Sequence, residues 1–193
     1  MSLWLARATV LVANGVQVIL RAPHGKRSAS IKVIKDRRGA LETFLLTLAG
    51  IGFFPAILWT VIPVHWFADY SSGLPLWIAG TLCYAAGLWL LYRSHADLGR
   101  NWSITLEVRE DHALVTGGVY RHVRHPMYSG LMLWALGQAL VLANWLVGPA
   151  YLVTFGILFA FRVRREEKML LDQFGASYEA YMARTKRLVP LVW

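Results

Sequence analysis

Residues 126–163 read PMYSGLMLWALGQALVLANWLVGPAYLVTFGILFAFRV. The stretch holds two apolar runs, each near the length of about 20 residues that crosses a bilayer as a helix. Only Asn144-Trp145 separates the two runs, and a connection that short folds one helix back on the other. The stretch therefore predicts an antiparallel helical hairpin in a membrane.

The rest of the chain has the same apolar character. Of its 193 residues, 56% are hydrophobic and 16% are charged, and the mean hydropathy is +0.44, whereas roughly a quarter of the residues are charged in a soluble domain. We predict an all-α fold: one integral membrane domain over residues 1–193, a bundle of about five transmembrane helices. Its parts are spans near 3–20, 41–64, 74–92, 126–143 and 145–163, a cytosolic loop at 93–125, and a cytoplasmic amphipathic helical tail at 164–193.

The first apolar run is the shortest and contains Arg7. A cleaved signal peptide is the alternative to a retained helix here. Signal peptides are basic before the apolar region, whereas in this chain the basic residues follow it, so a retained helix is favoured.

Basic residues are distributed unevenly over the connections. Seven lie between 21 and 40, five arginines lie in 93–125, and seven basic residues lie from Arg162 onward, whereas 65–73 has none. Because Lys and Arg accumulate on the cytoplasmic side of a membrane, we expect the N-terminus outside and both the 93–125 loop and the tail in the cytoplasm.

The predicted hairpin brings two polar clusters to one membrane surface. Arg124-His125-Pro126 begins the fourth span, and Arg162 to Glu167 ends the fifth. Pro126 alone has a structural explanation, because proline suits the first turn of a helix. The adjacent carboxylates Glu166 and Glu167 are costly at a membrane-facing helix end without partners, so we expect the two clusters to contact each other.

Several of these elements resemble the isoprenylcysteine carboxyl methyltransferases and the related phospholipid methyltransferases of membranes. The resemblance covers roughly residues 74–190. The matching elements are Leu98-Gly99 with Asn101-Trp102-Ser103, Gly118-Val119-Tyr120, Arg124-His125-Pro126-Met127-Tyr128-Ser129-Gly130, Arg162 followed by Glu166-Glu167, and Phe174-Gly175 with Tyr178 and Tyr181.

The resemblance implies a methyltransferase that uses S-adenosylmethionine and releases S-adenosylhomocysteine. The acceptor would be lipophilic and enter from the bilayer, most simply the carboxylate of an isoprenylcysteine-like molecule. Arg162 would orient that carboxylate, and Glu167 would share the catalytic role. The residues implied to bind the cofactor are Tyr120, Arg124, His125, Pro126, Tyr128, Glu166 and Glu167.

The tail leaves two readings open. We expect its first helix to end at Phe174, with Gly175 as the cap, and a second helix to begin at Ser177 with Tyr178 and Tyr181 on one side. That second helix either lies on the membrane, where it would bind anionic lipids, or closes over a site.

Other classes of function fit the sequence less well. The basic residues lie between apolar runs and form no stripe beside stacking aromatics, so nucleic acid is not the expected partner. The histidines show no ligand pairing with acidic residues and Cys83 stands alone, so no metal is expected. A lipid amine or thiol acceptor, or a membrane scaffold without enzymatic activity, stays open as an alternative.

Overall fold

The structure is a computed structural model that describes residues 3–29, 33–36, 39–62, 67–102, 107–109 and 113–190. Parts of the predicted elements lie outside the described residues. They are the end of the second span at 63–64, residues 103–106 and 110–112 of the loop, with Ser103 of the family match, the last residues of the tail at 191–193, and the basic residues Lys32, Arg37 and Arg38.

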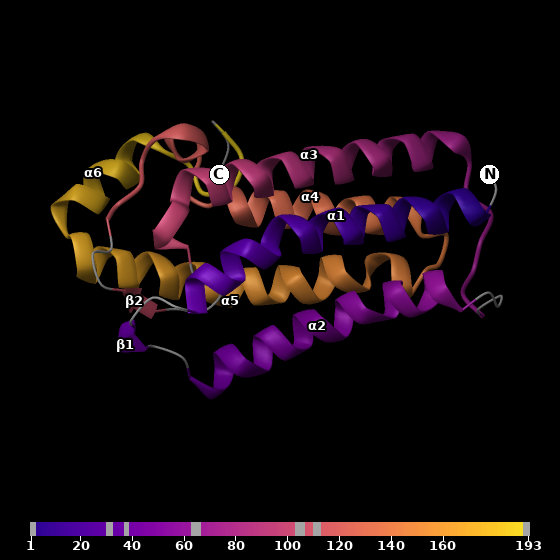
Figure 1. Cartoon of the computed structure of the whole chain (residues 1–193), viewed down its shortest axis with the longest axis horizontal. Coiled ribbons are helices and arrows are strands. Elements are labelled where there is room, and N and C mark those ends of the chain that lie inside the picture. The colour runs from indigo at the N-terminus through magenta and orange to yellow at the C-terminus, as the bar shows by residue number, and fades with distance from the viewer. Residues whose placement is uncertain are drawn as a thin grey trace.

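In the described part of the chain, five helices lie roughly side by side and form a bundle (Figure 1). They are α1 (Leu3–Ala29), α2 (Ala40–Val61), α3 (Leu74–Leu98), α4 (Pro126–Val141) and α5 (Val147–Phe174). A sixth helix, α6 (Ala176–Arg184), and two 3-10 turns, η1 (Gly99–Asn101) and η2 (Gly118–Arg121), lie at the end of the bundle opposite the N-terminus. The predicted all-α class is confirmed.

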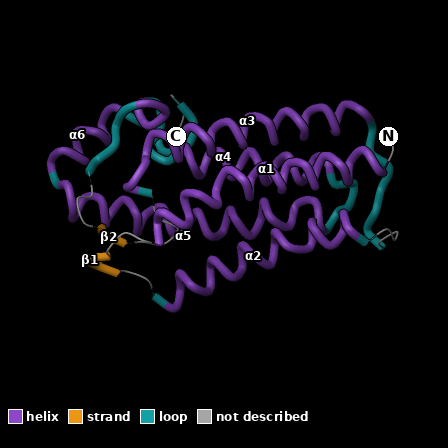
Figure 2. Tube along the Cα trace, in the orientation of Figure 1, coloured by secondary structure: helices purple, strands orange, loops and turns teal. Residues whose placement is uncertain are grey.

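Two short strands are the only extended elements among the described residues. β1 (Val33–Asp36) pairs antiparallel with β2 (Glu107–Arg109), and Figure 2 shows the pair toward the end of the bundle opposite the N-terminus. The pair joins the connection after α1 to the loop after α3. The two strands are a small addition to a fold that is otherwise helical over the described residues.

The helix bounds differ from the predicted spans. α1, α2, α3 and α5 are long and apolar enough to cross a membrane. α4 has 16 residues, a rise of about 24 Å, which is less than the roughly 30 Å of a hydrocarbon core. The bundle thus has the five predicted helices, and four of them meet the length needed for a span.

α1 continues nine residues beyond the predicted end of the first span. It reaches Ala29 and contains Pro23, so Arg21, Lys26 and Arg27 are helical and do not belong to a connection. A span was assigned only where the chain is apolar, whereas a helix continues wherever its backbone stays hydrogen-bonded. Pro23 removes one such bond, and the helix continues past it.

Glycines bring α3 and α4 into close contact. A Cβ atom on Gly87 would lie 2.8 Å from the carbonyl oxygen of Gly130, and one on Gly137 would lie 2.9 Å from that of Gly80. Only glycine lets two helix backbones approach this closely, as is common between helices in membranes. This pair of helices forms the most extensive contact in the bundle.

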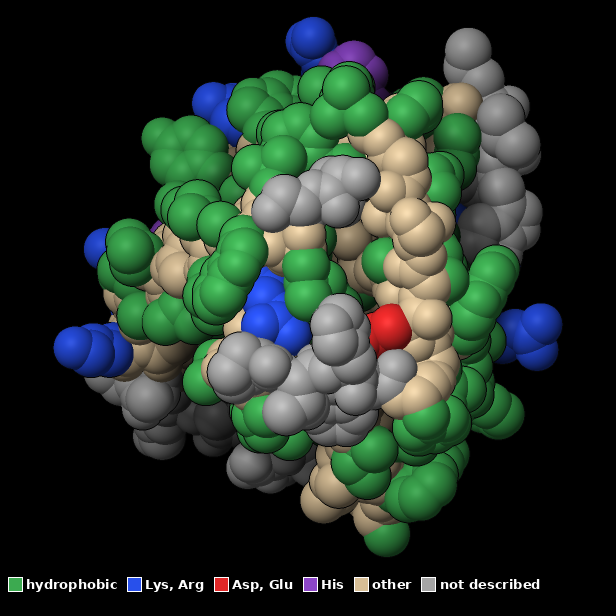
Figure 3. Space-filling view, turned by 90° about the vertical axis from the view of Figure 1, so that its right-hand side faces the viewer, with side chains coloured by type: hydrophobic (Ala, Val, Ile, Leu, Met, Phe, Trp, Pro, Cys, Tyr) green, Lys and Arg blue, Asp and Glu red, His purple; other side chains and the backbone are tan. Residues whose placement is uncertain are grey.

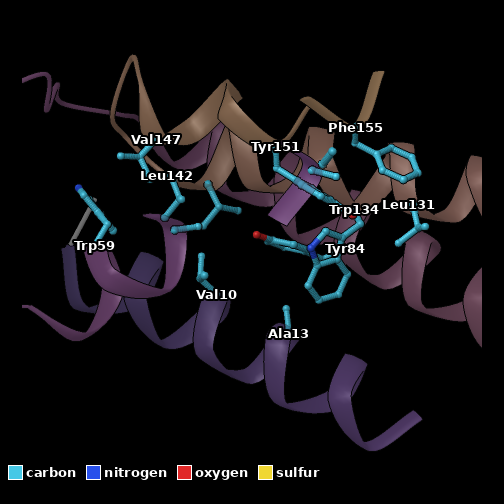
Figure 4. Packing of buried hydrophobic residues seen from close by; sticks show 14 of the residues in the cluster. Val10, Ala13, Trp59, Tyr84, Leu131, Trp134, Leu142, Val147, Tyr151 and Phe155 are labelled. Carbon is cyan, nitrogen blue, oxygen red and sulfur yellow. The ribbon is translucent and has the colours of Figure 1, made fainter. Parts of the chain in front are cut away.

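The core takes buried side chains from each of the helices α1 to α5. Within it, Tyr84 meets Trp134 edge to face with ring centres 4.7 Å apart (Figure 4). Large apolar side chains also cover the outside: Trp4 and Ile19 are 72% exposed and Phe67 is 85% exposed. Figure 3 shows hydrophobic side chains over most of the end where the N-terminus lies. An apolar core under an apolar surface is the arrangement expected of a protein surrounded by lipid.

The α4–α5 turn confirms the predicted hairpin. The side-chain oxygen of Asn144 accepts hydrogen bonds from the backbone N–H groups of Leu146 and Val147 at 2.9 and 2.8 Å, and its amide donates to Asp69 Oδ1 at 2.7 Å. Asp69 also accepts from Trp59 Nε1 at 2.9 Å. Asn144 therefore satisfies backbone N–H groups at the start of α5 and joins the hairpin to the α2–α3 connection by hydrogen bonds.

Candidate active site

The start of α4 and the second half of α5 meet, as the hairpin predicts. Arg124 Nε donates to Glu167 Oε1 at 3.0 Å, and His125 Nε2 lies 3.4 Å from the same oxygen. The Tyr128 hydroxyl donates to Glu166 Oε2 at 2.7 Å. Residues about 40 positions apart in the chain thus form one polar cluster, in which Glu167 has partners just before α4 and Glu166 has a partner in the first turn of α4.

Arg162 lies between two carboxylates. Its Nη1 is 3.6 Å from Glu42 Oε1 on α2, and its Nε is 4.0 Å from Glu166 Oε2 one helical turn along α5. The side chains of Arg162 and Glu42 are 10% and 3% exposed. The contact with Glu42 spans 120 residues, and the sequence analysis missed Glu42, because a single acidic residue at the start of an apolar run gives no signal of its partner.

Glu167 connects α4 to the C-terminal segment. Arg187 donates hydrogen bonds to both oxygens of the Glu167 carboxylate. Oε2 accepts from Nε at 3.0 Å and from Nη2 at 2.8 Å, and Oε1 accepts from Nε at 3.2 Å. This hydrogen bonding raises the pKa of Arg187 above its ordinary value. With Arg124 and His125 also on Oε1, the carboxylate of Glu167 is fully engaged by protein groups.

The C-terminal segment is also held by backbone hydrogen bonds. The N–H of Arg124 donates to the carbonyl of Lys186 at 2.7 Å, and the N–H of His125 donates to that of Arg187 at 3.0 Å. Ser129 Oγ donates to the carbonyl of Leu188 at 2.7 Å. The residues after α6 are therefore part of the site's framework and run along the start of α4.

α6 faces the polar cluster. α5 ends at Phe174, and Gly175 follows with φ 50°, a left-handed conformation that favours glycine, so the predicted cap is confirmed. Tyr178 and Tyr181 are 1% and 2% exposed. Burial raises the pKa of Tyr181 to about 12, and its hydroxyl donates to the carbonyl of Tyr120 at 2.5 Å.

A second glycine shapes the segment before α4. Gly118 has φ 60°, and a Cβ atom there would lie 2.1 Å from Asp97 Oδ2. That same oxygen accepts the backbone N–H of Val119 at 2.8 Å. The close approach of Asp97 fixes η2 against the end of α3 and so sets the position of Tyr120.

A cavity of about 260 Å³ opens beside this cluster. It approaches the size of pockets that hold small molecules, roughly 300–1,000 Å³. One part of its wall is apolar and comes from α2, α4 and α5, through residues such as Leu46, Leu131, Phe155 and Leu158. The charged residues in its wall are Arg21, Arg124, Arg162 and Glu166.

The structure brings all the predicted site residues together but not all to the cavity. Tyr120, Arg124, His125, Tyr128, Arg162 and Glu166 line it, whereas Pro126 and Glu167 do not. Pro126 is fully buried in the first turn of α4. Glu167 is 4% exposed and lies behind the wall, where it holds Arg124 and Arg187.

Comparison with known proteins places the chain among membrane methyltransferases. Residues 78–172 match the model of the isoprenylcysteine carboxyl methyltransferase (ICMT) family. A probable protein-S-isoprenylcysteine O-methyltransferase of Oryza sativa subsp. indica is 29% identical over 193 residues, covering 98% of this chain and 96% of the relative. Protein-S-isoprenylcysteine O-methyltransferase B of Arabidopsis thaliana is 34% identical over 189 residues, covering 96% and 90%. The chain belongs to the ICMT family.

Membership in the ICMT family makes the chain an enzyme of the methyltransferase type. The solved structure of the eukaryotic intramembrane Ras methyltransferase ICMT is similar, with a TM-score of 0.55 and 28% identity. The similarity covers 82% of this chain and 55% of that one, so this chain spans about half the length of the solved relative. The shared fold agrees with the four helices, counted over the described residues, that are long and apolar enough to cross a membrane.

Every site residue predicted from the sequence lies within the range matched by the ICMT family model. The groups that the sequence analysis missed lie outside it: Arg21 of α1, Glu42 of α2 and Arg187 after α6. The site therefore combines a core from α4 and α5 with side chains from both ends of the chain.

Proposed function

We propose that this protein transfers a methyl group from S-adenosylmethionine to the carboxylate of a lipophilic, isoprenylcysteine-like acceptor. The observation that carries the proposal is the cavity, which joins the polar cluster of α4 and α5 to an apolar wall. A carboxylate on an apolar chain needs both surfaces. The names of the relatives, which describe O-methylation of protein-S-isoprenylcysteine, support the same substrate class.

The residues around the cavity fit the cofactor. S-adenosylmethionine supplies a methyl group on a positively charged sulfur, which leaves as a neutral thioether. The carboxylate of Glu166 and the rings of Tyr128 and Tyr178 would attract a cation there. The hydroxyl of Tyr178 is buried and has no hydrogen-bond partner among the described residues, so a polar ligand in the cavity would satisfy it.

The residues behind the wall would hold this arrangement in place. Glu167 fixes Arg124 and the C-terminal segment, and the Tyr128 hydroxyl fixes the carboxylate of Glu166. Within the proposal, Glu167 is a positioning residue, since its carboxylate is already bonded by three side chains. Pro126 shapes the same turn from inside the core.

Methylation of a carboxylate requires no proton transfer by a side chain of the protein. An acceptor carboxylate is already ionised near neutral pH; its oxygen forms the new bond to the methyl carbon while the electron pair of the sulfur–carbon bond stays on sulfur. The protein contributes alignment of the two groups and exclusion of water. Over the described residues, the charged groups of the cavity wall are three arginines and one carboxylate. This excess of positive charge favours an anionic acceptor over a lipid amine.

The orientation in the membrane is part of the proposal. The site, α6 and the C-terminal segment lie at one end of the bundle, and the N-terminus lies at the other (Figure 1). Among the described residues, basic side chains occupy the last turns of α1, η2 and α6, namely Lys26, Arg27, Arg121 and Arg184. By the positive-inside rule, the site faces the cytoplasm, where anionic lipids could also contact the basic tail.

Calorimetric binding of S-adenosylhomocysteine to the purified, detergent-solubilised protein tests the proposal. We expect saturable binding, weakened by roughly tenfold or more in Glu166→Gln, because a hydrogen bond or ion pair to a charged group contributes about 1.5–3 kcal/mol. Glu179→Gln is the matched control, since Glu179 is an exposed carboxylate on α6. A folded wild-type protein that binds no S-adenosylhomocysteine would rule the proposal out.

A further inference from the structure

Arg21 lies in the wall of the same cavity, although it belongs to α1. Its guanidinium carbon is 5.7 Å from the ring centre of Trp102, a cation–π distance. Trp102 is 4% exposed, and its indole N–H points to Met127 Sδ at 3.0 Å. A ring fixed by α4 therefore holds the guanidinium of Arg21 at the cavity.

The other two arginines of the cavity wall are engaged by carboxylates, whereas Arg21 is not. Arg124 is bonded to Glu167, and Arg162 is close to Glu42 and Glu166. No Asp or Glu of the described residues forms an ion pair with Arg21. Its positive charge at the edge of an apolar cavity is therefore available to an anion from outside the chain.

The surroundings of Arg21 indicate what kind of anion fits. Arg21 is within electrostatic range of Tyr151, which precedes Arg162 on α5 by about three helical turns. Leu46 and Ala49 of α2 line the same cavity. The guanidinium thus lies toward the apolar part of the cavity, which favours an amphiphile with one carboxylate on an apolar chain.

We propose that Arg21 binds the carboxylate of the lipophilic acceptor and so determines the acceptor class. This inference rests on the proposed function and changes one part of the sequence prediction, in which Arg162 had that role. Arg162 then positions Glu166 and links α5 to α2. The cofactor also carries a carboxylate, so the experiment must separate binding of the acceptor from binding of the cofactor.

The test measures binding to the purified protein in detergent, with S-adenosylhomocysteine present. The two probes are N-acetyl-S-farnesylcysteine and its carboxamide, which keeps the apolar chain but lacks the charge. The variants are Arg21→Gln, Arg21→Lys and the control Lys26→Gln, which removes an exposed positive charge from the same helix. The affinity for S-adenosylhomocysteine alone is measured for each variant.

We expect the wild-type protein to bind the carboxylate more tightly than the carboxamide. Arg21→Gln should abolish that preference, lowering affinity for the carboxylate by roughly 10- to 100-fold, the range expected for a charge-assisted contact. Arg21→Lys should restore part of the preference, because it keeps the charge but not the two-pronged geometry. Lys26→Gln should match the wild type, and the affinity of Arg21→Gln for S-adenosylhomocysteine should stay within about twofold of wild type.

Two results overturn the inference. The first is that the wild-type protein binds the carboxylate no more tightly than the carboxamide, or that Arg21→Gln still binds the carboxylate more tightly. The other is an equal loss of affinity for S-adenosylhomocysteine in Arg21→Gln, which would assign Arg21 to the cofactor's carboxylate. Failure of the proposed function is a separate outcome, because it is seen as no binding of S-adenosylhomocysteine by the wild-type protein.

Discussion

The contact between Glu42 and Arg162 should couple α2 to the site energetically. At 3.6 Å, two unit charges attract by about 5 kcal/mol in a medium with an effective dielectric constant of about 20. The desolvation of both groups offsets much of this attraction, so the pair's net contribution is small. Removing one partner is different, since it leaves a buried charge less compensated and costs about 3–5 kcal/mol.

Glu42→Gln is therefore expected to lower the free energy of unfolding by about 3 kcal/mol, at the lower end of that range, because Glu166 still lies 4.0 Å from Arg162. Reversible unfolding in mixed detergent and SDS measures the change. Arg162→Gln and the double variant complete a mutant cycle, in which the double variant should cost much less than the sum of the single variants. The exposed Glu179→Gln should change stability by less than about 0.5 kcal/mol.

Two results would refute this reasoning. If Glu42→Gln unfolds like the wild type, the ion pair has no energetic role. If the effects of Glu42→Gln and Arg162→Gln add without coupling, each side chain acts through other contacts.

Three further predictions follow from the packing and from the tail. Gly87→Ala should impair folding or lower stability by roughly 1–3 kcal/mol through overpacking, because a Cβ atom would lie 2.8 Å from the Gly130 carbonyl oxygen. Gly156→Ala should be tolerated, because a Cβ atom there meets no atom within 4 Å. Thermal unfolding in detergent compares the two variants. Glu167→Gln should loosen the C-terminal segment and speed its cleavage by trypsin, because Arg187 loses a bidentate partner, and cleavage at the wild-type rate would contradict this. The pKa of Tyr181 is raised from 10.0 to about 12. The stability contributed by its protonated hydroxyl is therefore present below about pH 10 and is lost as the pH rises through about 12. Tyr181→Phe should remove that part of the pH dependence of tail cleavage by trypsin.

The sequence predicted the α4–α5 hairpin, and with it the meeting of the two polar clusters, because both depend on local signals. Asn144 interrupts an apolar stretch, and its side-chain oxygen accepts hydrogen bonds from backbone N–H groups at the start of α5. Once α4 and α5 are antiparallel, the cluster at Arg124 has to meet the cluster at Glu167. The glycine cap at Gly175 is likewise a local signal, and it was read correctly.

The contacts that were missed join segments far apart in the chain. Glu42 meets Arg162 only because α2 packs against α5, and Arg21 lies at the cavity because α1 continues past residue 20, where the predicted span ends. Hydropathy ends a span where the charged residues begin, so it assigned Arg21 to a connection. Hydropathy also overestimated the length of α4, because the helix ends at Val141 and the backbone is extended at Leu142, before the apolar run ends.

Transfer of a labelled methyl group tests the central claim most directly. Purified protein is incubated with S-adenosylmethionine labelled in its methyl group and with N-acetyl-S-farnesylcysteine, and the organic extract is then treated with base. We predict label in the extract that base releases as methanol, because a methyl ester is hydrolysed by base whereas a methylated amine or thiol is not. Label that resists base would contradict carboxylate methylation, and absence of any transfer by folded protein that binds S-adenosylhomocysteine would contradict the proposed acceptor class.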